Sequence, residues 1–141
     1  MKAALRVSLL ALATATHAVA DEQSVLLVAH PDVSTPRLTR DTTRAIFAMR
    51  QRTWPDGQAA RVFVLPNDHP LHARFVKESL AVYPHQLQLA WDRMVFSGTG
   101  QAPTRVATQA EMREQIATTP GALGYLDREY LDDRVQVIAM D

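Results

Sequence analysis

Short apolar runs alternate along this chain with stretches whose apolar residues recur at helical spacing. The runs that predict strands end at Pro, Gly or charged residues; they cover 24–29, 61–65, 105–106, 122–126 and 135–139. The stretches that predict helices cover 41–49, 69–82, 85–96 and 109–117. This order predicts an α/β sandwich, a mostly parallel sheet flanked by helices. The run SVLLVA (24–29) is continuous, as in strands of parallel sheets that are buried on both faces.

The helix predicted over 69–82 has a clear start signal. Asn67 or Asp68 is expected to cap it through a side-chain oxygen, and Pro70 suits a first turn because its missing N–H costs nothing there. In the helix over 85–96, Trp91 lies at helical spacing from Leu87 and Val95, which predicts a place in the core. The aromatic residues expected in the core are Phe47, Trp54, Phe63, Phe75, Trp91, Phe96 and Tyr125.

The first twenty residues predict a cleavable secretory signal peptide. Lys2 and Arg6 give a positive start, a short apolar stretch follows, and the Ala18–Ala20 segment supplies the small residues of a cleavage site. A helix packed on the domain is the alternative interpretation of this segment. Export would leave one α/β domain over 21–141, and it predicts a periplasmic location.

Composition excludes several classes of protein. The 15 basic residues balance the 15 acidic ones, and a general nucleic-acid binder would carry a basic excess. The absence of cysteine excludes disulfides, thiolate metal sites and Cys nucleophiles. No apolar run reaches the roughly 18–20 residues that a membrane-spanning helix needs. Neither a G-x-S-x-G nor an H-E-x-x-H motif is present, so we expect no enzyme and no cofactor.

The best candidate for an anion site is the start of the helix over 69–82. Free N–H groups and the helix dipole favour an anion at such a position. Asp68, His69, His72 and Arg74 surround this start, and an ordinary capped helix start is the alternative interpretation. His30 is a further candidate, because it ends the first predicted strand and ligands of open α/β sheets bind at the carboxyl ends of strands.

The same histidines allow a metal hypothesis. His69 and His72 are three residues apart, so they share a helix face, and with His30 or Asp68 they could ligate Zn²⁺ or Cu²⁺. Two polar surface histidines with no ligand are the alternative interpretation.

Four segments resemble a known family. They are LTRDTTRAIFAMRQRTWPDG (38–57), HARFVKESL (72–80), LAWDRMVFSGTGQAP (89–103) and TTPGALGYLD (118–127). Together they resemble the small periplasmic-binding-protein-like family of phosphate ABC transporter substrate-binding proteins. The segment P-G-A-L-G-Y is the most specific element, and the W-P-D-G turn is the next.

The resemblance implies a type II periplasmic-binding-protein-like fold, here as a single lobe. It implies binding of inorganic phosphate or another small anion, and an envelope transporter or receptor as partner. Full phosphate receptors bind phosphate at a Ser-Gly-Thr turn that follows an Asp. Here Asp68 is present, but His69, Pro70 and Leu71 replace the hydroxyl donors. The function expected is weak anion binding; a ligand-free interaction module and a periplasmic metal binder are the alternatives.

Overall fold

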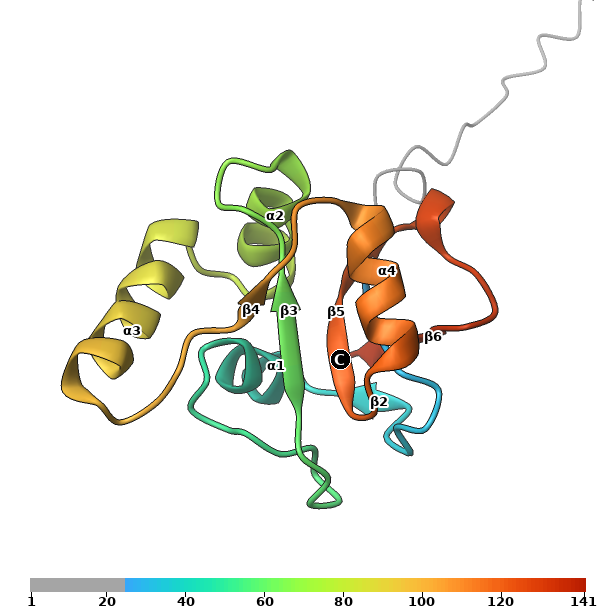
Figure 1. Cartoon of the computed structure of the whole chain (residues 1–141), viewed down its shortest axis with the longest axis horizontal. Coiled ribbons are helices and arrows are strands. Elements are labelled where there is room, and N and C mark those ends of the chain that lie inside the picture. Colours follow the sequence, from blue (N-terminus) through green and yellow to red (C-terminus); the bar gives the residue numbers. More distant parts are fainter. Residues whose placement is uncertain (1–24) are drawn as a thin grey trace, which may run out of the picture.

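The computed structural model describes residues 25–141 (Figure 1). The signal peptide and the cleavage site predicted over 1–20 lie outside these residues and stay predictions. Within the described range, no helix is long and apolar enough to cross a membrane.

A five-stranded sheet forms the centre of the domain. Its strands are β1 (Val25–Ala29), β3 (Arg61–Val64), β4 (Thr104–Arg105), β5 (Ala122–Asp127) and β6 (Gln136–Val137), in the order β4-β3-β5-β1-β6. β3 pairs in parallel with both β4 and β5. β1 pairs antiparallel with β5 and β6, so four strands run one way and β1 runs the other. The sheet is therefore mostly parallel, as predicted, but the first strand is its antiparallel member.

The last predicted strand, over 135–139, is divided between two sheets. β6 pairs with β1 in the central sheet. After Ile138 the chain turns to β7 (Ala139–Met140), which pairs in parallel with β2 (Arg37–Leu38) in a separate two-stranded sheet. The apolar pattern over 135–139 is therefore continuous in sequence but serves two sheets.

The helices are α1 (Arg40–Phe47), α2 (Pro70–Arg74), α3 (Pro84–Ser97) and α4 (Gln109–Thr118), with a short 3₁₀ turn, η2 (Arg128–Tyr130), after β5. Thr39 and Thr108 cap α1 and α4 through their side-chain oxygens. α2 continues into η1, a π-helical turn over Phe75–Ser79 that ends before Ala81. The helix predicted over 69–82 is thus shorter, and its winding changes at Phe75. Phe75, Val76 and Leu80 are buried, and the helical segment ends just before Ala81, which has a left-handed φ of 56°.

Helices cover both faces of the central sheet (Figure 1). α4 packs on one face and contacts β5, β3 and β1. The approach is close at Gly124, where a Cβ would lie 2.5 Å from the Met112 sulfur and 2.9 Å from the Ile116 terminal methyl. A side chain at position 124 would therefore require the Met112 and Ile116 side chains to move.

The aromatic core lies on the opposite face of the sheet. Phe75 stacks on Tyr125 with ring centroids 4.3 Å apart, and Phe47 lies 4.9 Å from Phe75. Trp91 joins α3 to this layer, since its indole N–H donates to the Phe47 carbonyl at 2.8 Å. Trp91 is 1% exposed, which confirms the prediction that it belongs to the core.

The outer side of α3 corrects two core predictions. Val95 is 51% exposed and Phe96 is 88% exposed, although both were expected to be buried. Leu87 and Trp91 already fill the contact between α3 and the rest of the domain. Val95 and Phe96 follow in the last turn of α3, beyond that contact, and the helix ends at Gly98, whose left-handed φ of 71° provides the cap.

Candidate functional site

One edge of the sheet collects the carboxyl ends of three strands. β3, β4 and β5 run in parallel, so the segments that follow them emerge on the same side. α2 follows β3, and α4 follows β4. We call this side the carboxyl edge. Ligands of open α/β sheets bind at edges of this kind.

His69, and not Asn67 or Asp68, caps α2. The His69 imidazole Nδ1 accepts a hydrogen bond from the Leu71 N–H at 3.1 Å, and the next residue, Pro70, has no N–H. His69 replaces the predicted caps because it lies next to the first helical residue, in an extended conformation. Asp68 is exposed beside this start. Of the backbone N–H groups expected to bind an anion, that of Leu71 is therefore occupied and that of position 70 is absent.

His72 is buried beneath this edge, so it is not a surface histidine. Its side chain forms a hydrogen bond through Nδ1 with the Tyr125 hydroxyl, which also accepts from the Leu65 N–H at 2.9 Å. The other ring nitrogen, Nε2, is buried without a hydrogen-bond partner among the described residues. Burial, with the positive charge of Arg105 nearby, lowers the pKa of His72 to about 4. His72 is therefore neutral at pH 7.

Two arginines reach this edge, and both have protein partners. Arg74 lies 3.9 Å from an Asp127 oxygen. The other oxygen of Asp127 accepts from the Gln109 amide at 3.0 Å, which links α4 to the end of β5. Arg105 donates to the Gln88 side chain on α3 at 3.1 Å. The positive charge at the carboxyl edge is thus partly engaged within the domain.

His30 lies at the other edge of the sheet, away from His69 and His72. It follows β1, and its N–H donates to the Ala122 carbonyl at the first residue of β5. β1 runs antiparallel, so its carboxyl end meets the amino end of β5. The five residue steps along β5 from Ala122 to Asp127 span roughly 16 Å at the usual rise of a strand. His30 pairs there with Asp32, at 2.7 Å.

This placement contradicts the metal hypothesis for His30, His69 and His72. One ion cannot join side chains from opposite edges of a sheet, and His72 faces Tyr125 in the core. Among residues 25–141, no group of three or more His, Asp and Glu side chains is close enough to hold a metal ion.

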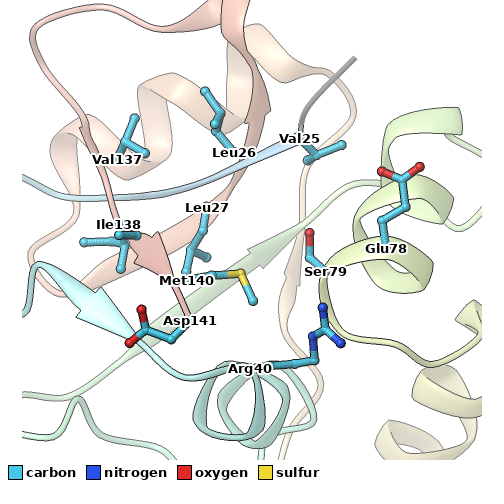
Figure 2. Close-up of a pocket in the computed structure, with 11 residues that line it drawn as sticks. Val25, Leu26, Leu27, Arg40, Glu78, Ser79, Val137, Ile138, Met140 and Asp141 are labelled. Atoms are coloured by element: carbon cyan, nitrogen blue, oxygen red, sulfur yellow. The ribbon is translucent and has the colours of Figure 1, made fainter. Parts of the chain in front are cut away.

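A hollow of about 320 Å³ lies apart from these residues, beside the start of β1. In Figure 2, Val25, Leu26 and Leu27 line one side of it, and Arg40 extends from α1 toward Ser79. Its remaining lining residues are Glu78, Val137, Ile138, Ala139, Met140 and Asp141. None of the residues proposed from the sequence for ligand binding takes part.

Sequence reasoning missed three side chains that organise the carboxyl edge. Tyr125 bonds the buried His72, Gln109 bonds Asp127, and Arg105 lies close enough to affect the pKa of His72. Tyr125 was expected only in the core, and nothing in the local pattern marks Gln109 or Arg105. Their roles depend on the parallel pairing that brings β4 and β5 beside β3.

The fold of the described residues is similar to that of solved phosphate receptors. A structure from Clostridium perfringens, described as a phosphate ABC transporter substrate-binding protein with bound phosphate, superposes with a TM-score of 0.66 at 14% identity, over 82% of this chain and 44% of that one. An ABC-type phosphate transport receptor from Vibrio cholerae gives 0.64 at 14% identity, over 82% and 45%. PstS from Borrelia burgdorferi gives 0.64 at 12% identity, over 83% and 47%.

The described domain has the fold of one lobe of a type II periplasmic binding protein. The fold class and the resemblance predicted from the sequence are therefore confirmed. The chain spans less than half the length of these three receptors. No protein-family model matches the sequence, and no curated protein matches it. At 12–14% identity the likeness concerns the fold.

Proposed function

We propose that this lobe is a periplasmic solute-binding-type domain that holds a small oxyanion such as phosphate weakly at its carboxyl edge. The observation that carries the proposal is the match of 82% of the chain, at a TM-score of 0.66, to a protein described with bound phosphate. Export through the signal peptide predicted over 1–20 would place the domain where such receptors meet their transporter.

The geometry of the α2 start favours low affinity. The Leu71 N–H is bonded to His69, and Pro70 offers no donor. The exposed Asp68 repels a fully ionised anion. A single lobe also presents only one wall, so bound phosphate would keep part of its hydration shell. Water that remains at the site weakens each hydrogen bond.

Cations at the same edge supply the attraction that remains. Arg74 and Arg105 lie on opposite sides of the His69–His72 segment in the chain, and the structure brings both toward it. Arginine suits oxyanions because its planar guanidinium donates two parallel hydrogen bonds. Either side chain could exchange part of its protein contacts for an anion.

Titration of the purified protein with inorganic phosphate at pH 7, followed by backbone amide NMR, tests the proposal. We expect a dissociation constant no tighter than about 0.1–1 mM for the monomer, equivalent to roughly −4 to −5.5 kcal/mol. The shifts should centre on residues 68–72 and shrink in Arg105→Gln, while the exposed control Arg61→Gln retains them. Micromolar affinity in a verified monomer, or no shift at 20 mM phosphate, would contradict the proposal.

A second candidate function, protein docking, has one observation in its favour. Leu89, Val95 and Phe96 on α3 are 49%, 51% and 88% exposed, and exposed apolar groups that gather on one helix are often contact surfaces. A photoreactive residue placed at Phe96 should then form a crosslinked product in cells, while the same residue at Arg61 should not. Equal crosslinking at both positions would argue against docking through α3.

A further inference from the structure

Two adjoining hollows lie beside α1 and α3, away from the carboxyl edge. The first, of about 210 Å³, is lined by residues at the end of α1 and on the first turns of α3, among them Arg44 and Arg50. The second, of about 400 Å³, is lined by Lys77, Ala81 and Tyr83. Val82 and Gln86 line both hollows, so the two adjoin each other. We call the two hollows together the α1–α3 groove.

The groove is basic. Arg44, Arg50 and Lys77 line it, and no Asp or Glu is among the residues that line either hollow. Arg44 has one acidic neighbour, Asp41, at 3.3 Å, but that carboxylate is 92% exposed and held by a single contact. An exposed pair of this kind contributes little stability. An anion could therefore compete for Arg44.

Two hydrogen-bonding groups in the groove are unused. The Nε of Arg44 is buried and has no hydrogen-bond partner among the described residues. The Arg50 guanidinium forms no hydrogen bond or ion pair with any residue in the range 25–141. A buried guanidinium N–H without an acceptor is costly. The Arg44 side chain as a whole is 37% exposed, so an oxyanion in the groove would contact its solvent-facing atoms and the Arg50 guanidinium, while the Nε stays buried.

The backbone around the groove is held in an unusual conformation. In residues 25–141, the non-glycine residues with positive φ are Met49, at 63°, and Ala81, at 56°. Met49 directly precedes Arg50, and Ala81 directly precedes Val82, so each strained residue positions a neighbour that lines the groove. Strained residues of this kind persist only where the surrounding structure fixes them, and they cluster at binding sites.

Part of the groove lining is apolar. Val82 and Leu87 contribute aliphatic side chains to the same hollow as the two arginines. At the other end, Tyr83 is 58% exposed and stacks on His85 at 5.8 Å, which provides an aromatic wall. Guanidinium groups beside apolar and aromatic side chains fit a ligand with an oxyanion head and a short apolar or aromatic tail.

We propose that the α1–α3 groove is a second binding site, which takes a small organic oxyanion: a phosphate monoester or a carboxylate with a short apolar tail. Arg44 and Arg50 bind the oxyanion, and Val82 and Tyr83 contact the tail. The site is separate from the carboxyl edge, since none of Asp68, His69, His72 or Arg74 lines it. It therefore goes beyond the proposed function and does not depend on it.

Amide NMR titration with phenyl phosphate, and separately with inorganic phosphate, tests the groove. We expect phenyl phosphate to shift the amides of Arg50, Val82 and Gln86, and to bind there at least five times more tightly than inorganic phosphate. Shifts confined to residues 68–72, or no shift near the groove at 10 mM phenyl phosphate, would overturn the proposal. Because the two sites have different reporter amides, failure of one is distinguishable from failure of the other.

Arginine variants sharpen the test. Arg50→Gln is the principal variant because its side chain is exposed and its loss should leave the fold intact; it should weaken phenyl phosphate at least tenfold. The matched control is Arg93→Gln, an exposed arginine on α3 that does not line the groove. Unchanged affinity in Arg50→Gln, or equal loss in Arg93→Gln, would overturn the proposal.

The same headgroup chemistry occurs on lipids. The first hollow, of about 210 Å³, has room for a small free ligand, so we expect the protein to remain in solution when vesicles containing phosphatidic acid are sedimented. Sedimentation with such vesicles that Arg50→Gln abolishes, together with no binding of phenyl phosphate, would overturn the assignment to a free small molecule.

Discussion

The α2 start and the α1–α3 groove both gather positive charge, but they use it differently. At the α2 start, His69 caps the helix and the two nearby arginines contact Asp127 and Gln88. In the groove, Arg50 has no partner within the described residues, and the buried Nε of Arg44 has none either. A helix start can therefore satisfy itself, whereas an open basic groove still has hydrogen bonds to offer.

The largest effect on stability should come from removing Trp91, which joins α3 to α1 beside the groove. Trp91 is fully packed between α3 and α1 and donates to the Phe47 carbonyl. We expect Trp91→Ala to lower the free energy of unfolding by roughly 3–5 kcal/mol, the usual range for a large aromatic in a core. Urea denaturation followed by circular dichroism measures it. A loss below about 1 kcal/mol, near the level of a surface change, would show that α3 is not anchored by Trp91.

Acid should destabilise the carboxyl-edge side through His72. The pKa of His72 is about 4 in the folded chain, whereas an unperturbed histidine, as in the unfolded chain, has a pKa of 6.5. Between these two pH values the unfolded chain binds a proton that the folded chain does not. Stability should therefore fall as pH drops from 6.5 to 4, by up to roughly 3 kcal/mol, and this group should add no further loss below pH 4.

Denaturant titrations at pH 7, 5.5 and 4 measure that slope. His72→Gln should have lower stability at pH 7 but a flatter dependence on pH, because the titrating group is gone. The matched control is His85→Gln, a change at an exposed histidine, which should keep the slope of the unmodified protein. An equal flattening in both variants would contradict the assignment to His72.

Releasing the cap of α2 should make the two regions more alike. His69→Gly removes the imidazole that accepts from the Leu71 N–H. We expect a cost of about 1 kcal/mol or less, typical of a lost helix cap. The freed N–H should strengthen phosphate binding at residues 68–72 by a few-fold, with no change at Arg50. Weaker phosphate binding in this variant would show that His69 itself contacts the anion.

The smallest effect is expected on the outer side of α3. Phe96 is 88% exposed, so Phe96→Ser should change the free energy of unfolding by no more than about 0.5 kcal/mol. It should leave phenyl phosphate binding in the groove unchanged, because Phe96 does not line it. A large loss of stability would mean that Phe96 is covered in solution, and analytical ultracentrifugation would detect the covering copy.

Local sequence patterns determined the elements of the described domain. The runs over 61–65 and 122–126 form β3 and β5, and the helix predicted over 85–96 forms α3 within one residue at each end. These predictions hold because helical periodicity and apolar runs are properties of neighbouring residues. The exposure of Phe96 could not be predicted from the sequence. It depends on how far α3 extends past the part of the domain that Leu87 and Trp91 contact, and that is decided by tertiary packing.

The candidate ligand residues of the carboxyl edge were identified in the sequence only as a list. Asp68, His69, His72 and Arg74 do lie at or beneath one edge, since they follow one strand. The direction of β1 decided that His30 lies at the other edge, and strand direction depends on long-range pairing. The burial of His72 beneath Tyr125 likewise depends on the packing of α2 against β5.

By itself, the sequence determined the α/β order, the buried strands, the position of Trp91 and the resemblance to phosphate receptors, because each is encoded by residues close together in the chain. Tertiary structure alone decided which donors are free. The Leu71 N–H donates to His69, whereas Arg44 and Arg50 line one hollow with Val82, which precedes α3, and Gln86 on α3. Whether a polar group has a partner depends on residues far away in sequence, and no local pattern contains that information.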